Sequence, residues 1–124
     1  MSKKALIYIV EDDEIMASCL SRVLKTKGYN LKIFPNVIEV MNTLDKEEFL
    51  PDLIFLDVLL PGFDGFSFLN EISTYPDTSK IPIILVSSLD FHGKDLKIYG
   101  VKGILKKEDM TPKEILTYAE RYTN

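Results

Sequence analysis

The sequence has little of three features that define whole classes of protein: cysteine, long apolar runs and excess positive charge. Its one cysteine, Cys19, cannot form an internal disulfide, and a single reduced thiol is typical of a cytoplasmic protein, which is the location we expect. No apolar run exceeds a few residues and no signal-peptide cleavage pattern follows residues 1–4, so we expect neither a membrane span nor secretion. Nineteen acidic residues outnumber 15 basic ones, and this net charge of -4 argues against direct binding of nucleic acid.

The sequence does contain enough apolar material for one core. Hydrophobic residues make up 46% of the chain and charged residues 27%, which is typical of a globular domain and unlike a disordered chain. No repeat or low-complexity linker divides the 124 residues. We therefore expect residues 1–124 to form a single domain.

Short apolar runs alternate with segments of helical periodicity along the chain. The apolar runs predict five buried strands, at residues 5–10, 31–34, 53–57, 81–87 and 103–106. Five helices are predicted between and after them: one carrying Met16 to Leu24 with a C-cap at Gly28, one over 36–45, one capped by Asp64, a weak one over 90–99, and one that begins with the capping box Thr111-Pro112-Lys113-Glu114. This alternation predicts a doubly wound α/β sandwich of three layers around a parallel sheet.

Charged and hydroxyl side chains follow the predicted strands at their carboxyl ends, where ligands bind in folds of this class. Glu11, Asp12 and Asp13 follow the first strand, Asp57 ends the third, Ser87 ends the fourth and Lys107 follows the fifth. Two ionised carboxylates about 5 Å apart repel each other by about 3 kcal/mol at an effective dielectric near 20. Because Mg²⁺ prefers carboxylates, waters and carbonyls, and no calcium-loop pattern is present, we expect Mg²⁺ at this edge of the sheet.

Phosphoryl chemistry is the interpretation that gives each of these residues a task. Asp57 is a candidate nucleophile that attacks phosphorus to give an aspartyl phosphate. The ammonium group of Lys107 and the hydroxyl of Ser87 are suited to holding phosphoryl oxygens.

Four motifs at these strand ends resemble the receiver domain of two-component response regulators. They are VEDDE at 10–14, DLIFLDVLLPGFDGFSFL at 52–69, IPIILVSS at 81–88 and GVKGILKK at 100–107. The resemblance spans nearly the whole chain and implies a flavodoxin-like sheet of strand order 2-1-3-4-5. It also implies that Asp57 accepts a phosphoryl group from a histidine kinase or phosphotransfer protein, that Ser87 and Lys107 contact that group, and that Mg²⁺ is held by Glu11, Asp12, Asp57 and the Leu59 carbonyl.

The resemblance further implies a signalling switch and not an enzyme acting on an outside substrate. The surface formed by the fourth helix, the fifth strand and the fifth helix would change its affinity for a downstream protein, as a monomer or as a phosphorylation-dependent dimer. The chain ends directly after the last helix, so we expect no output domain in it, and a stand-alone regulator and an excised domain look the same in this sequence.

The sequence departs from the family pattern at several positions. Serine stands at Ser87 where threonine is frequent, Ile104 occupies the place of the aromatic switch residue, and Glu108 replaces the proline that usually follows the lysine in a cis peptide. We therefore expect a rearranged loop after Lys107. Leu59 and Leu89 are apolar where a polar group could guide an attacking water, which predicts slow autodephosphorylation.

Three alternatives to the switch differ in the residues that they require. A flavin-binding electron carrier is disfavoured because four acids follow the first strand, and a phosphatase or phosphotransferase because Leu59 stands where a second acid is wanted. Ile104 and Glu108 favour a receiver that only docks to partners without being phosphorylated, but the intact set of site residues argues against it: Glu11, Asp12, Asp57, Ser87 and Lys107. Cys19 is expected to be a small buried residue of the first helix, and His92 a surface residue without a role.

Overall fold

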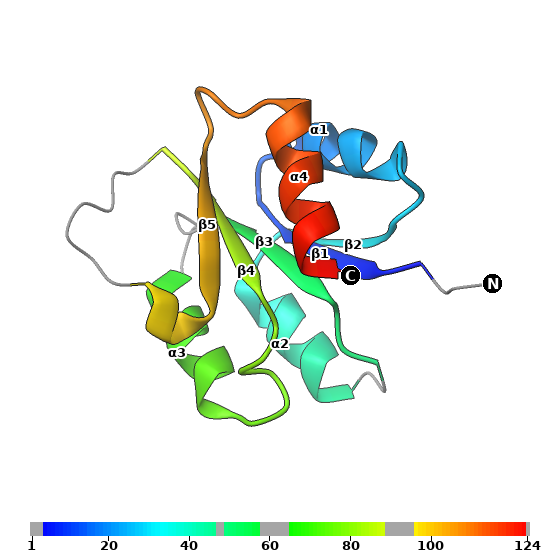
Figure 1. The fold of residues 1–124 in the computed structure, drawn as a ribbon. Coiled ribbons are helices and arrows are strands. Elements are labelled where there is room, and N and C mark those ends of the chain that lie inside the picture. The colour runs from blue at the N-terminus through cyan, green and yellow to red at the C-terminus, as the bar shows by residue number, and fades with distance from the viewer. Residues whose placement is uncertain (1–3, 47–48, 58–64, 89–95, 124) are drawn as a thin grey trace.

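A five-stranded parallel sheet forms the centre of the molecule, in the order β2-β1-β3-β4-β5 (Figure 1). The computed structural model describes residues 4–46, 49–57, 65–88 and 96–123. Within them the strands are β1 (Leu6–Val10), β2 (Asn30–Phe34), β3 (Leu53–Asp57), β4 (Ile83–Ser87) and β5 (Val101–Lys106). This is the order that the resemblance implied, and it confirms the flavodoxin-like fold.

Helices cover both faces of the sheet and so produce the three layers. The helices are α1 (Glu14–Lys25), α2 (Val37–Lys46), α3 (Gly65–Thr74) and α4 (Pro112–Thr123), with a 3₁₀ helix η1 (Lys97–Tyr99). Successive side chains of a strand point to opposite faces, so the central strands supply two separate apolar clusters. Ile7, Ile9 and Phe55 pack with α1 and α4, whereas Tyr8, Ile54 and Leu56 pack with α2 and α3.

Local sequence fixes the ends of two helices. The Asp13 carboxylate accepts hydrogen bonds from the backbone N–H groups of Ile15 (2.9 Å) and Met16 (3.3 Å), and thus caps α1. The predicted capping box of the last helix is confirmed, because the Thr111 hydroxyl accepts from the Glu114 N–H and the Glu114 carboxylate accepts from the Thr111 N–H. These caps hold the first turns of α1 and α4 at the carboxyl edge of the sheet.

Two expectations from the sequence change. The fourth of five predicted helices, over 90–99, is described only from residue 96 onward, and there it is the short η1 and not an α-helix. Residues 89–95 lie outside the described residues, and so does His92.

The prediction that Cys19 is buried is wrong, because this side chain is exposed on α1. The buried stripe of that helix consists of Ala17, Leu20, Ser21 and Leu24. Cys19 precedes Leu20 by one position, about 100° around the helix, on the side away from Ser21. It therefore points to solvent. Within the described residues, no helix combines the length and the apolar character needed to span a lipid bilayer.

Candidate functional site

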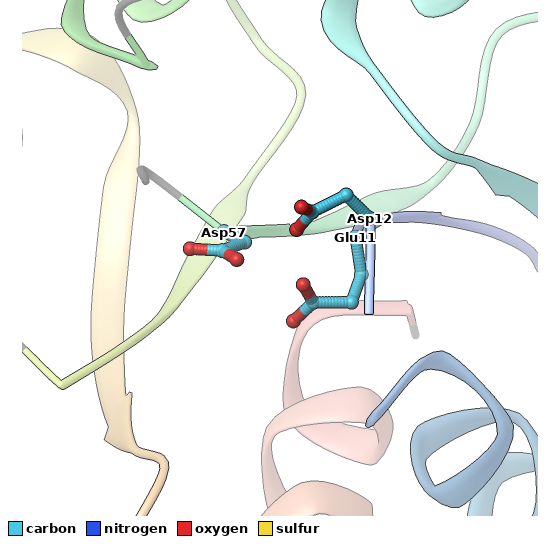
Figure 2. Close-up of side chains that lie close together, drawn as sticks. All are labelled: Glu11, Asp12 and Asp57. Carbon is cyan, nitrogen blue, oxygen red and sulfur yellow. The ribbon is translucent and has the colours of Figure 1, made fainter. Parts of the chain in front are cut away.

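Three carboxylates meet at the carboxyl edge of the sheet. Glu11 and Asp12 directly follow β1, and Asp57 is the last residue of the neighbouring strand β3. One oxygen from each lies within 4.8 Å of the others, and Figure 2 shows the three side chains gathered at one point. At this separation each ionised pair repels by about 3 kcal/mol at an effective dielectric near 20. The arrangement therefore favours a bound cation.

Burial differs among the three acids. Glu11 and Asp57 are each 3% exposed, whereas Asp12 is exposed to solvent. The site is thus closed on the side of the core and open on the side of Asp12. An ion held there would keep contact with water, which Mg²⁺ and related hard divalent ions favour because they dehydrate reluctantly.

Lys107 adds a positive charge to the buried pair. Its Nζ lies 3.0 Å from Asp57 Oδ2, to which it donates a hydrogen bond, and 3.3 Å from Glu11 Oε1. Partial burial opposes the charged form of Lys107, but the hydrogen bond to Asp57 and the negative charges of Asp57 and Glu11 outweigh that effect and raise the pKa of the ammonium group. Lys107 is therefore a permanent cation beside Asp57.

Glu11 is the acid whose protonation the site changes most. Burial raises the pKa of Glu11 from 4.5 to about 7, and a hydrogen bond to Asp57 and its charge act in the same direction. The N–H of Asp13, which donates to Glu11 Oε2 at 3.2 Å, and the charge of Lys107 oppose the rise. Near neutral pH and without a metal ion, Glu11 is thus partly protonated, and an incoming divalent ion has to displace this proton.

The end of β4 lies beside the end of β5. Ser87 is fully buried, it is the register partner of Lys106, and its carbonyl accepts a hydrogen bond of 3.1 Å from the N–H of Lys107. This bond fixes the backbone of Lys107 against that of Ser87. The structure therefore brings the ends of β4 and β5 together with Lys107, which itself contacts Asp57.

The loop after Lys107 contains a contact that sequence reasoning missed. A hydrogen bond to the Ser88 side chain is the main cause that lowers the pKa of Glu108. Every peptide bond among the described residues is trans, including the one between Lys107 and Glu108. Glu108, an exposed residue, thus contacts the residue that follows β4. Nothing in the sequence pairs these two positions.

Of the other residues singled out in the sequence, Asp13 and Ile104 are described by the structure. Asp13, although it belongs to the acidic run, uses its carboxylate to cap α1. Ile104 is partly buried against the cluster that α2 and α3 cover. Leu59, expected to offer its carbonyl to the metal, and Leu89 both lie outside the described residues.

The ligand set indicates which ions fit. It is made only of carboxylate oxygens, and no imidazole or thiol belongs to the cluster within the part of the chain that the structure describes. Oxygen ligands of this kind suit Mg²⁺, Mn²⁺ or Ca²⁺ and not the softer ions that thiolates select. The site is therefore able to bind a hard divalent cation.

The chain matches a known protein family over most of its length. The response regulator receiver domain family matches residues 7–120. The chain is similar to the uncharacterized transcriptional regulatory protein YvcP of Bacillus subtilis, with 42% identity over 82 residues that cover 66% of this chain and 32% of YvcP. It spans 32%, 11% and 53% of the lengths of three curated relatives that it matches.

Two solved structures extend the comparison over nearly the whole chain. One is the signal receiver domain of a signal transduction histidine kinase from Syntrophus aciditrophicus, with 28% identity, a TM-score of 0.82, and 96% of this chain and 89% of that one covered. The other is the Mn²⁺-bound form of response regulator Rcp1, with 27% identity, a TM-score of 0.72, and 94% and 90% covered.

Proposed function

The chain belongs to the response regulator receiver domain family, whose members are phosphorylation-dependent switches of two-component signalling, and from this premise we propose that Asp57 is its phosphoacceptor. One observation carries the proposal: Asp57 ends a central strand with a lysine ammonium 3.0 Å away and with two further carboxylates within 4.8 Å. A nucleophile that contacts a cation and belongs to a metal-binding cluster is the arrangement that phosphoryl transfer requires.

The reaction is a transfer from phosphohistidine to aspartate. A carboxylate oxygen of Asp57 attacks the phosphorus atom, an O–P bond forms, and the P–N bond to the donor breaks with the electron pair leaving on the imidazole nitrogen. The product is an aspartyl phosphate. The protein acts on no outside substrate and promotes only its own phosphorylation and a slow loss of the phosphoryl group.

Lys107 and Ser87 hold the transferred group. The ammonium group of Lys107 already contacts Asp57, and after transfer it neutralises charge on a phosphoryl oxygen. The Ser87 hydroxyl donates to another phosphoryl oxygen. Because the Lys107 N–H is bonded to the Ser87 carbonyl, a movement of one residue toward the phosphoryl group carries the other with it.

Mg²⁺ is the ion we assign to the acidic cluster. Glu11, Asp12 and Asp57 are its ligands, together with the carbonyl of Leu59, a residue outside the described part of the chain. Bound there, Mg²⁺ supplies positive charge for the phosphoryl oxygens. The residues of the chain would hold the ion and orient Asp57 toward the donor, and Glu11 would give up its proton when the ion binds.

The partners follow from this chemistry. The donor is a sensor histidine kinase or phosphotransfer protein of the cytoplasm, and the receiver of the signal is a downstream protein that prefers one phosphorylation state. We assign the changing surface to η1, β5 and α4, and the active form is a monomer or a phosphorylation-dependent dimer. Residues 1–124 act in this scheme as one phosphoacceptor unit, without direct contact to nucleic acid or membrane.

A docking domain that is never phosphorylated is the second candidate. The replacement of the usual aromatic residue by Ile104 and of the usual proline by Glu108 favours it, because both positions belong to the conformational response of the family. The contact between Lys107 and Asp57 weighs against it, since a domain without phosphoryl chemistry has no need of a lysine at this buried carboxylate.

Mass spectrometry separates the two candidates. The protein is incubated with acetyl phosphate or phosphoramidate, with and without Mg²⁺, and its intact mass is measured. We expect a gain of about 80 Da, one phosphoryl group, that needs Mg²⁺ and disappears in Asp57→Asn. Asp109→Asn, a change of an exposed acid in the same region, is the matched control and keeps the gain. Wild-type protein that gains no mass even from a kinase donor contradicts the switch and supports the docking domain.

A further inference from the structure

Residues of α2 and α3 line a groove on the face of the sheet that these two helices cover. Figure 1 shows the two helices on this face of the sheet. It consists of two hollows, of about 600 Å³ and about 320 Å³, which share Met41 of α2 and Glu71 of α3 as walls. None of the residues that line it belongs to the acidic cluster or to the group around Lys107. The groove is thus a surface separate from the proposed phosphorylation site.

The floor of the groove is apolar, and apolar side chains also stand at its ends. Leu44 and Ile72 form the floor of the larger hollow and Phe68 that of the smaller one, and all three are buried. Ile38 at one end is 59% exposed and Tyr75 at the other is 53% exposed. These two exposed side chains extend the apolar surface of the floor to both ends of the groove.

The larger hollow is negatively charged. Three carboxylates line it, from Asp45, Glu71 and Asp77, and no lysine or arginine lines it within the described residues. Both helices start at the carboxyl edge of the sheet and therefore end near this hollow, where the C-terminal ends of their dipoles add partial negative charge. A ligand of this groove is therefore apolar along its length and positively charged at one end.

We infer that the groove binds a short amphipathic helix of another protein, with one apolar stripe and lysine or arginine residues at the end that lies between Asp45 and Asp77. A groove between two helices accepts a third helix through apolar anchors at positions i, i+4 and i+7. The ten residues of α2 span about 15 Å, which is the length of a partner helix of about ten residues. Opposite charge at the larger hollow fixes the direction of the bound helix.

A designed peptide tests the inference without knowledge of the natural partner. The probe is a 14-residue helix of leucine and alanine with an apolar stripe and three lysines at one end, and the matched control peptide carries three glutamates in their place. Each is titrated into ¹⁵N-labelled protein of residues 1–124 while amide chemical shifts are followed. We expect the lysine peptide to shift amides of α2 and α3 in a saturable manner, and the glutamate peptide to bind at least 10-fold more weakly.

Charge reversal on the protein completes the test. The double variant Glu71→Lys, Asp77→Lys is expected to weaken the lysine peptide at least 10-fold, whereas Glu120→Lys, which reverses an exposed acid on α4, leaves its affinity within 2-fold. Equal affinity of the double variant and the wild type overturns the inference, and so do shifts confined to other elements. Sedimentation of the unliganded protein tests whether the groove instead binds a second copy of the chain. If the wild type forms dimers and the double variant does not, the groove is a dimer interface, and the proposed partner helix is contradicted.

Discussion

Protonation of Glu11 makes the stability of the metal-free protein depend on pH in an unusual direction. The pKa of Glu11 is about 7 in the folded protein and 4.5 in an unstructured chain. Between these values the folded state binds more protons than the unfolded state, so the free energy of unfolding falls as the pH rises. From pH 5 to pH 8 this one group accounts for a loss of about 2–3 kcal/mol.

The variant Glu11→Gln isolates this effect. Glutamine keeps the size of the side chain and cannot ionise, so the difference in stability between wild type and variant is expected to change by about 2–3 kcal/mol from pH 5 to pH 8, in favour of the variant. Urea denaturation in EDTA at four pH values measures it. Glu14→Gln, a change of an exposed acid three positions away, is the control and should follow the wild type.

Mg²⁺ should stabilise the protein most at pH values at which Glu11 has lost its proton. Added Mg²⁺ binds the folded protein, so it stabilises the wild type more at pH 8 than at pH 5 and raises the unfolding midpoint most where the metal-free protein is weakest. Parallel pH profiles of wild type and Glu11→Gln in EDTA would refute the reasoning, because they would mean that the burial of Glu11 beside Asp57 does not hold its proton.

Three further changes test other parts of the structure. Leu59→Asn should speed the loss of the phosphoryl group because it offers a polar group to the attacking water, whereas Leu59→Ala should not; an unchanged or lower rate, read from the decay of the phosphorylated mass, refutes the idea. Gly103→Ala should lower the free energy of unfolding by about 1–3 kcal/mol, because the added Cβ would lie 2.5 Å from Tyr118 Cε1. The decrease, measured by urea denaturation, should be smaller in a Tyr118→Leu background, and equal decreases in both backgrounds would exclude this contact as the cause. Asp13→Ala should destabilise the protein by about 1 kcal/mol through loss of the α1 cap while the phosphorylation of Asp57 persists; loss of phosphorylation in the folded variant would show that Asp13 belongs to the site.

Much of the fold could be predicted because its signals are local. The capping box at Thr111 and Glu114 lies within four residues, and the strand 53–57 was predicted with the bounds that the structure gives to β3. The convergence of Glu11, Asp12 and Asp57 was predictable from the rule that parallel strands end at a common edge. The order of the strands in the sheet, by contrast, was predicted from the family resemblance, because the periodicity of apolar residues does not show it.

The features that were missed depend on contacts between distant residues. Cys19 is exposed because α1 packs on the sheet with the face that carries Ala17, Leu20, Ser21 and Leu24. The apolar residues of this helix do not by themselves show which of two neighbouring faces is the buried one. The close approach of Tyr118 to Gly103 joins α4 to β5 and has no sequence signal beyond a glycine in a strand. The acid-lined groove between α2 and α3 is formed by the packing of these two helices, and no sequence motif predicts it.

The placement of the two chain ends has an architectural consequence. Lys4 and Thr123 line the same hollow, near the start of β1 and the end of α4, and the carboxylates lie at the opposite ends of β1 and β3. Figure 1 shows the start of β1 and the end of α4 on the same side of the molecule. Residues 4 and 123 therefore lie on one common side of the molecule, at the end of the sheet opposite to Asp57. The same proximity makes the chain suitable for insertion into a surface loop of another protein, or for circular permutation through a short connector between its ends. This geometry lets one unit be attached at either end, or at both, on the side of the molecule that is opposite to the carboxylates.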